Sequence, residues 1–300
     1  MSFAPTGGEG LNRVPGVRQR RMSPRRRLVI ASVGLLAAVI GLFTYGVGAF
    51  DGLEETTIDT RFAIRGDQVP PDELIVVGID DDTFSDLELQ FPFPRSLHAK
   101  VVDELVADRA AVIAYDVQFT EPTSRREDNA LVRAVWSAPA ITLATTEVTR
   151  RGEHRVLGGE GTLEQGRDAR AGDAQIELSD GGVLRELPPN DTGLDLFPIV
   201  VAEQRGAAPI AESSFPNDRW IDFFGPPGTI PSVSFSDVAA GDFEPGTFEG
   251  KTVFVGAMAS SLQDSHKVPT ADDEMFGVEY QATATATIEA GFPLRSAGEL

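Results

Sequence analysis

The chain has 300 residues, of which 41% are hydrophobic, so it can bury a sizeable core, and disorder throughout is excluded. It contains no cysteine, which excludes disulfide bonds, thiolate metal sites and a cysteine nucleophile. The formal net charge is -20 although seven arginines gather before residue 28, so the remainder is strongly acidic, which argues against nucleic acid as its partner.

The first fifty residues have the pattern of a membrane anchor. Residues 1–27 are rich in Gly, Pro, Ser and Arg without periodicity, which predicts a disordered, basic, cytoplasmic tail. Residues 28–50 carry no charge over 23 positions, enough at about 1.5 Å per residue for one transmembrane helix. Arginines precede this run and acids follow it, so the main domain is expected outside the cytoplasm. The alternative is a removable signal peptide, but the run exceeds the usual ~7 to 15 apolar residues.

Residues 51–65 lead from the predicted membrane segment into the main domain. Leu53, Ile58 and Phe62 recur at near-helical spacing among charged residues, which predicts a juxtamembrane helix. Its expected role is to space the domain from the bilayer, and transmission of motion is the alternative.

The next stretch predicts a strand, a helix and a second strand. The apolar run at residues 74–79 is typical of a parallel strand buried on both faces, and it ends in Asp80. Leu97, Val101 and Leu105 recur at helical spacing, and Ser96 is expected to cap the helix that they predict. A second strand at residues 111–115 ends in Asp116. Parallel strands joined by a crossover end at the same edge of the sheet, where α/β proteins bind ligands, so we expect a site there.

The alternation of helices and strands continues to the end of the chain. We therefore expect an α/β fold with a mostly parallel sheet, flanking helices and β-hairpin additions. The predicted helices are residues 128–136, 194–204, 235–240 and 277–290, and the predicted strands are 140–145, 220–224 and 251–256, with a hairpin at 176–187. The polar, glycine-rich residues 146–175 are interpreted as a surface excursion.

Several stretches, in order, resemble the CHASE domain of type 2, an extracellular sensor associated with cyclases and histidine kinases. They are ELIVVGID at residues 73–80, PFPRSLHA at 92–99, YDVQFTE at 115–121, DGGVLR at 180–185, GKTVFVG at 250–256 and FGVE at 276–279. The chain departs from the family pattern at Phe93, where the family has Trp, and at Gln281 and Thr283, where it commonly has His and Asn.

The resemblance implies a membrane receptor. Its sensor would occupy residues 66–293, and residues 294–300 would begin a linker to a further membrane segment. The implied output module is a cytoplasmic adenylate or guanylate cyclase, histidine kinase or Ser/Thr kinase. We expect such a receptor to be a homodimer that binds an unidentified small ligand.

The candidate ligand-binding residues are mostly acids that follow strands, together with two basic side chains. They are Asp80, Arg95, His98, Asp116, Glu121, Asp264 and Glu279. Asp80 and Asp116 are also candidate metal ligands, and the site would hold Mg²⁺, Ca²⁺ or a small cationic organic molecule. Four of these residues, and Arg185, also have a structural interpretation: Asp80 as a helix cap, His98 as a packed side chain, and Arg95, Arg185 and Glu279 as salt-bridge partners.

Two other function classes remain open. A membrane-anchored surface hydrolase would use a divalent metal held by the same carboxylates, although the sequence supplies no evident nucleophile or general base. A purely architectural outer domain would pair receptors without binding a ligand.

Overall fold

The computed structural model describes residues 25–26, 28–36, 51–149, 151–179 and 181–294. They belong to two units, residues 1–53 and 54–300, and helix α2 (Asp51–Arg65) crosses the boundary. Residues 28–36 of the first unit are helical and expose their large apolar side chains. The rest of the predicted membrane segment, most of the predicted tail and residues 295–300 lie outside the described residues. Among the described residues, no helix has both the length and the apolar character needed to cross a membrane.

The second unit is built on a six-stranded sheet in which every pairing is parallel, which confirms the predicted α/β class. The strands follow the order β4-β3-β2-β6-β1-β5. Their bounds are β1 Leu74–Ile79, β2 Val112–Asp116, β3 Ile141–Thr145, β4 Ala169–Asp173, β5 Ser232–Ser234 and β6 Thr252–Ala257. A separate antiparallel pair consists of β7 (Ser265–Val268) and β8 (Ala271–Phe276).

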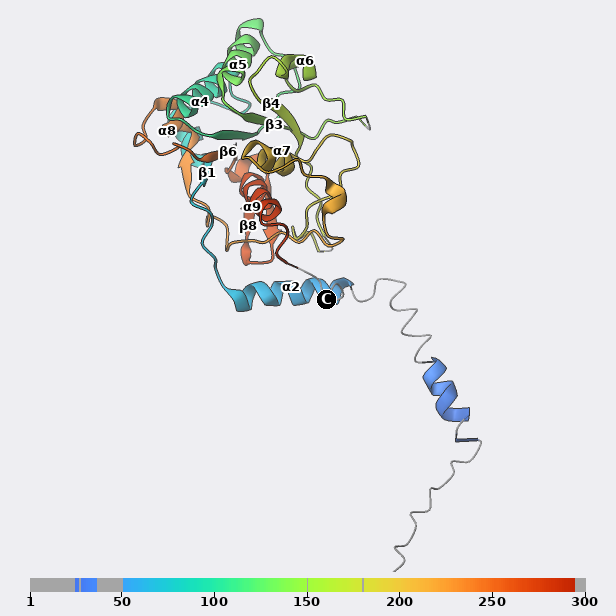
Figure 1. Ribbon diagram of the computed structural model, residues 1–300. Coiled ribbons are helices and arrows are strands. Elements are labelled where there is room, and N and C mark those ends of the chain that lie inside the picture. Colours follow the sequence, from blue (N-terminus) through green and yellow to red (C-terminus); the bar gives the residue numbers. More distant parts are fainter. Residues whose placement is uncertain (1–24, 27, 37–50, 150, 180, 295–300) are drawn as a thin grey trace, which may run out of the picture. The chain divides into compact units, whose positions relative to one another are not determined.

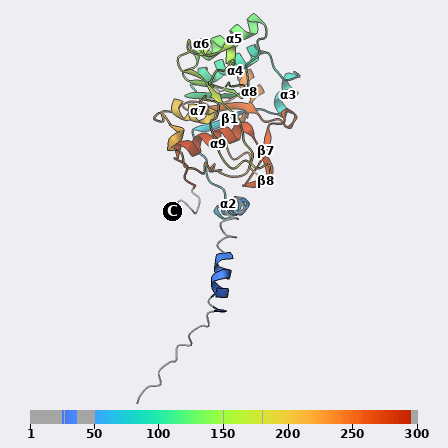
Figure 2. The ribbon, with the colours of Figure 1, turned by 90° about the vertical axis from the view of Figure 1, so that its right-hand side faces the viewer.

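Helices cover both faces of the sheet, which is why its inner strands are continuous apolar runs. In β1, Ile75 and Val77 pack into the core beneath α4, α5 and α8, whereas Leu74 and Val76 pack into the opposite core beneath α7 and α9. Figures 1 and 2 show α4 and α5 on one side of the sheet and α9 on the other. The helix bounds are α3 Asp81–Leu87, α4 Arg95–Ala107, α5 Arg125–Ser137, α6 Glu160–Leu163, α7 Phe197–Gln204, α8 Phe235–Ala240 and α9 Gly277–Glu289.

Helix α9 is enclosed along nearly its whole length. Every residue from Gly277 to Ile288 is buried. One face packs on the sheet through Val278 and Ala282, and the other packs through Tyr280 and Ile288 into a second core that also holds Ile58 and Phe62 of α2. The small residues of α9 let its backbone approach the neighbouring elements closely. Its buried threonine hydroxyls donate hydrogen bonds to backbone carbonyl oxygens one turn earlier in the same helix.

Three local predictions are wrong. Residues 220–224 form no strand: Trp220 makes a single antiparallel bridge to Glu186 and packs into the second core. The polar stretch interpreted as a surface excursion contains strand β4. Ser96 is not the cap of α4, which begins after Pro94, and its N–H instead donates to Glu127 Oε2 at 2.7 Å.

The contact between β4 and α7 gives the first testable prediction. A Cβ at Gly172 would lie 2.6 Å from Phe197 Cα, and a helix backbone cannot yield as a side-chain tip can. We expect Gly172→Ala to lower the free energy of unfolding by about 2 kcal/mol, the usual cost of overpacking, measured by urea titration. Gly161→Ala is the matched control because its Cβ would meet nothing within 4 Å. An equal effect of both substitutions would contradict this packing.

Candidate functional site

The carboxyl edge of the sheet opens into a pocket of about 700 Å³. Because all six strands run in the same direction, the segments that follow β1, β2, β3 and β6 leave the sheet at this edge. Five of the seven side chains proposed from the sequence line the pocket: Arg95, His98, Asp116, Glu121 and Asp264. The expected edge therefore carries the cavity.

Asp116 is the acid at the centre of this edge. It is the last residue of β2 and pairs in register with Gly256 of β6. Burial, followed by the nearby charge of Asp264, raises the pKa of Asp116 to about 8. The described residues provide no hydrogen-bond donor that would stabilise the charged carboxylate. Because the pKa of Asp116 is about 8, a large part of the Asp116 population is protonated at neutral pH.

Asp264 connects the pocket to the beginning of α9. It follows β6 by way of a short 3₁₀ turn, Ser260–Leu262, and its carbonyl oxygen accepts a hydrogen bond from Gly277 N–H at 3.0 Å. Its carboxylate lies against Gly277, where an added Cβ would be only 2.6 Å from Asp264 Oδ2. His266 Nε2 lies 3.5 Å from Asp264 Oδ1. A pocket carboxylate thus touches the first residue of the last helix.

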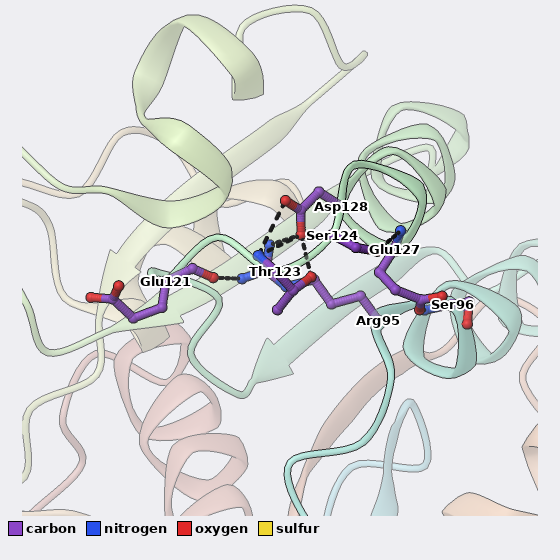
Figure 3. A network of polar contacts seen from close by, with 7 residues as sticks. All are labelled: Arg95, Ser96, Glu121, Thr123, Ser124, Glu127 and Asp128. Atoms are coloured by element: carbon purple, nitrogen blue, oxygen red, sulfur yellow. Dashed lines mark hydrogen bonds and ion pairs between the residues drawn. The ribbon is translucent and has the colours of Figure 1, made fainter.

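Arg95 is held by a network that joins α4 to α5, shown in Figure 3. Its guanidinium donates to Asp128 Oδ1 at 2.8 Å and to the carbonyl oxygen of Glu121. Asp128 also accepts bonds from the backbone and hydroxyl of Thr123, which hold its pKa below the usual range, and the charge of Arg95 lowers it further. The Glu121 carboxylate points away from Arg95 (Figure 3). The predicted pairing of Arg95 with a carboxylate is confirmed, and its partner is Asp128.

His98 is a packed, neutral member of an aromatic wall. Its ring is 1% exposed and lies near the rings of Phe119, Phe235 and Tyr115. Its Nδ1 is 2.8 Å from the Tyr115 hydroxyl. Burial, helped by the charge of Arg95, lowers the pKa of His98 to about 4, so the imidazole is uncharged at neutral pH.

Asp80 does not line this pocket. Its carboxylate accepts from the Thr83 backbone N–H at 2.8 Å, and the Thr83 hydroxyl oxygen accepts from the Asp80 N–H at 3.4 Å, which together form the capping box of α3. The expected meeting of Asp80 with Asp116 rested on β1 and β2 being neighbours, but β6 lies between them. The charge that acts on Asp116 is that of Asp264, which follows the intervening strand.

Glu279 and Arg185 also lie outside this pocket. Glu279 is 2% exposed and accepts from the backbone N–H groups of Gly228 at 2.9 Å and Ile230 at 3.2 Å, a structural role in backbone hydrogen bonding that replaces the predicted salt bridge. Burial raises the pKa of Glu279. Arg185 does form a salt bridge, with Asp59 of α2 at 2.9 Å.

The pocket contains groups that the sequence reasoning did not assign to a site. Phe91 and Phe93 form part of its wall together with Phe119. Their signal was present in the alternating aromatic and proline residues 91–94, which were considered only as part of a family motif. Within the described ranges, no three His, Asp or Glu residues are grouped so that they could hold a metal ion. The metal role of Asp80 and Asp116 stays a prediction.

Comparison with known proteins identifies a matching family. A family model described as the CHASE2 domain matches residues 34–298, a stretch that contains every pocket residue named above. Searches of the curated proteins and of the solved structures find no match.

Proposed function

The chain belongs to the CHASE2 domain family, a family of sensory domains, and we propose that it is the extracytoplasmic ligand-sensing domain of a membrane signal-transduction receptor. The observation that carries the proposal is the contact between the pocket and α9. Asp264 lines the pocket and its carboxylate lies against Gly277, the first residue of that helix. A ligand that moves Asp264 would act directly on α9.

The far end of α9 supports a route from the pocket toward the membrane. Ile288 of α9 and the following Phe292 share a core with Ile58 and Phe62 of α2. Helices α2 and α9 thus contribute side chains to one core, and α2 follows the predicted membrane anchor in the sequence. A ligand transmits a signal along this route if it binds two arrangements of α9 with different affinity. We propose that the signal regulates a cytoplasmic cyclase or kinase.

Membrane orientation is tested with single cysteines, because the chain has none of its own. A cysteine in place of Asp273, an exposed residue of β8, is expected to react with a membrane-impermeant maleimide on intact cells. A cysteine in place of Ser2 is expected to react only after the cells are lysed. Labelling of the Ser2 variant on intact cells, with protection of the Asp273 variant, would reverse the proposed orientation.

Regulation of an output is tested in a chimeric receptor, in which this chain precedes the membrane helices and adenylate cyclase domain of another receptor. In Gly277→Ala, the new Cβ would lie 2.6 Å from Asp264 Oδ2, so the carboxylate or the start of α9 must shift. We expect cyclic AMP output to change by about fivefold or more, as for a coupling of 1 kcal/mol or above. Gly161→Ala, in open space, is the control. Unchanged output in a folded Gly277→Ala receptor would remove the proposal.

A further inference from the structure

The pocket has one strongly apolar wall. Phe91, Phe93 and Phe119 line it, with the Phe91 and Phe93 ring centroids 5.5 Å apart. Smaller apolar side chains continue the surface around the sheet edge: Ile79, Ala144, Ala174, Ile176, Ala257 and Leu262. A volume of about 700 Å³ lies within the range of small-molecule sites and greatly exceeds the space needed by a bare ion. The wall therefore fits the apolar part of a small organic molecule.

The charged part of the lining is negative. Four acids line the pocket, namely Asp116, Glu121, Glu127 and Asp264, against the single guanidinium of Arg95. Because Asp116 is largely protonated at neutral pH, the other three supply the negative charge until a cation binds. That guanidinium is 5.7 Å from the centre of the Phe119 ring and already bonds Asp128 and the Glu121 carbonyl. His98 is neutral. An anionic ligand would meet an excess of like charge here.

Two polar groups that line this space, the half-buried Asp116 and the buried His98, have bonding capacity to spare. No described residue donates a hydrogen bond to the carboxylate of Asp116. His98, which is 1% exposed, uses Nδ1 for Tyr115, and its Nε2 has no hydrogen-bond partner among the residues of the described ranges. Polar groups that are largely enclosed are normally paired, so these open positions at the wall of the cavity are available to a polar group supplied by a ligand.

From these features we infer that the pocket binds an organic ammonium compound whose apolar body is aromatic or branched. The ammonium group lies between Asp116 and Asp264, and the apolar body packs on Phe91, Phe93 and Phe119. An ammonium donates several hydrogen bonds and supplies the positive charge that two neighbouring carboxylates lack. The inference rests on the proposed function, since it names the class of ligand that the same pocket senses.

A divalent cation is a less good fit than an ammonium. Mg²⁺ and Ca²⁺ take six or more oxygen ligands, and protein carboxylates normally supply several of them. In the described part of the chain, no group of three His, Asp or Glu residues is arranged to hold such an ion. A metal would also leave the aromatic wall uncovered, whereas an amine with an apolar body uses both halves of the pocket.

The test compares three molecules of nearly equal shape by isothermal titration calorimetry on the purified full chain. Phenethylamine carries the ammonium, 2-phenylethanol is neutral and phenylacetate is anionic. We expect phenethylamine to bind at least tenfold more tightly than either analogue. We also expect Asp116→Asn and Asp264→Asn each to weaken phenethylamine binding by at least tenfold. Asp273→Asn, a change at an exposed carboxylate outside the pocket, should have no effect.

Several results would overturn the inference. These are equal or tighter binding of phenylacetate or 2-phenylethanol, absence of phenethylamine binding, binding that survives both asparagine substitutions, and binding of Mg²⁺ or Ca²⁺ alone that depends on Asp116. Circular dichroism of each variant separates loss of binding from loss of the fold. The chimeric-receptor result for Gly277→Ala does not depend on ligand class. If output responds there while phenethylamine fails, the sensor proposal stands and the ligand class is wrong.

Discussion

Replacing Asp116 with asparagine is expected to raise the free energy of unfolding by about 3 kcal/mol at pH 8 and to change it little at pH 4. The pKa of Asp116 is about 8 in the folded protein and near its ordinary value, about 4, in the unfolded chain. Between these values the folded state keeps a proton that the unfolded state has lost, so stability falls as pH rises. Asparagine cannot ionise and avoids that loss.

The size of the effect follows from the pKa difference. Each unit is worth about 1.4 kcal/mol, so the rise from 3.8 to about 8 sets a ceiling of roughly 5 to 6 kcal/mol. The side chain is only half-buried, and water in the pocket reduces the loss below that ceiling. Urea titrations of parent and variant at pH 4, 6 and 8 measure the difference at each pH.

Two further variants check the cause. Asp264→Asn removes the second contribution to the raised pKa of Asp116 and should give a smaller change in the same direction. Asp273→Asn, at an exposed position outside the pocket, is the matched control for the loss of one carboxylate and should not reproduce the effect of Asp116→Asn at pH 8. A difference between parent and Asp116→Asn that does not grow from pH 4 to pH 8 would contradict the burial of this carboxylate.

An acid that weakens the fold at neutral pH calls for a compensating role. Apolar or amide side chains of similar size would fill the end of β2 at lower cost. Strongly shifted pKa values concentrate at functional sites, because binding and catalysis need charges in places that folding alone would leave neutral. The same substitution is therefore expected to stabilise the protein and to weaken the proposed ligand binding.

The strand, helix and strand at the start of the domain were predictable because their patterns are local. Burial on both faces makes β1 a continuous apolar run, and packing on one face gives α4 its helical periodicity. The order of strands was not predictable in this way. Strand β6 comes late in the chain and inserts between β1 and β2, which separates Asp80 from Asp116. No local pattern carries that information.

Errors elsewhere have equally specific causes. Strand β4 lies at the edge of the sheet, where its ladder partner is β3 and Asp173 adds a single bridge to Leu196. It therefore needs no apolar run and reads ARAGD. Residues 220–223 are the opposite case. The second core buries Trp220, Ile221 and Phe223. Their apolar pattern reflects this burial, although the segment forms no strand ladder. Hydrophobicity predicts where a segment lies more reliably than how its backbone is paired.

The site was predictable to a similar extent. The edge of the sheet follows from the topology rule, and Asp116 and Asp264 line the pocket at that edge. The aromatic wall and the partner of Arg95 depend on loops whose course the sequence does not reveal. Arg95 was expected to pair with a carboxylate because a cation is unfavourable at a helix amino terminus. Its partner, Asp128, lies in the first turn of the next helix.

This pairing gives the last prediction. Arg95→Met is expected to lower the free energy of unfolding by about 3 kcal/mol. Arg95 is 7% exposed, and its loss leaves the Glu121 carbonyl and one oxygen of Asp128 without their charged donor. Methionine fills the space of the arginine stem with a long apolar side chain, so the cost measures the loss of the polar network and not the opening of a cavity.

Arg109→Met is the matched control, because Arg109 and Glu249 form an ion pair at 2.7 Å with side chains 68% and 53% exposed. Solvent screens such a pair, and its loss should cost no more than about 1 kcal/mol. The double variant Arg95→Met with Asp128→Asn should recover part of the cost, because it removes the unpaired charge. If urea titrations find equal costs for Arg95→Met and Arg109→Met, the Arg95 network does not hold α4 against α5. The wall of the pocket would then need another source of rigidity.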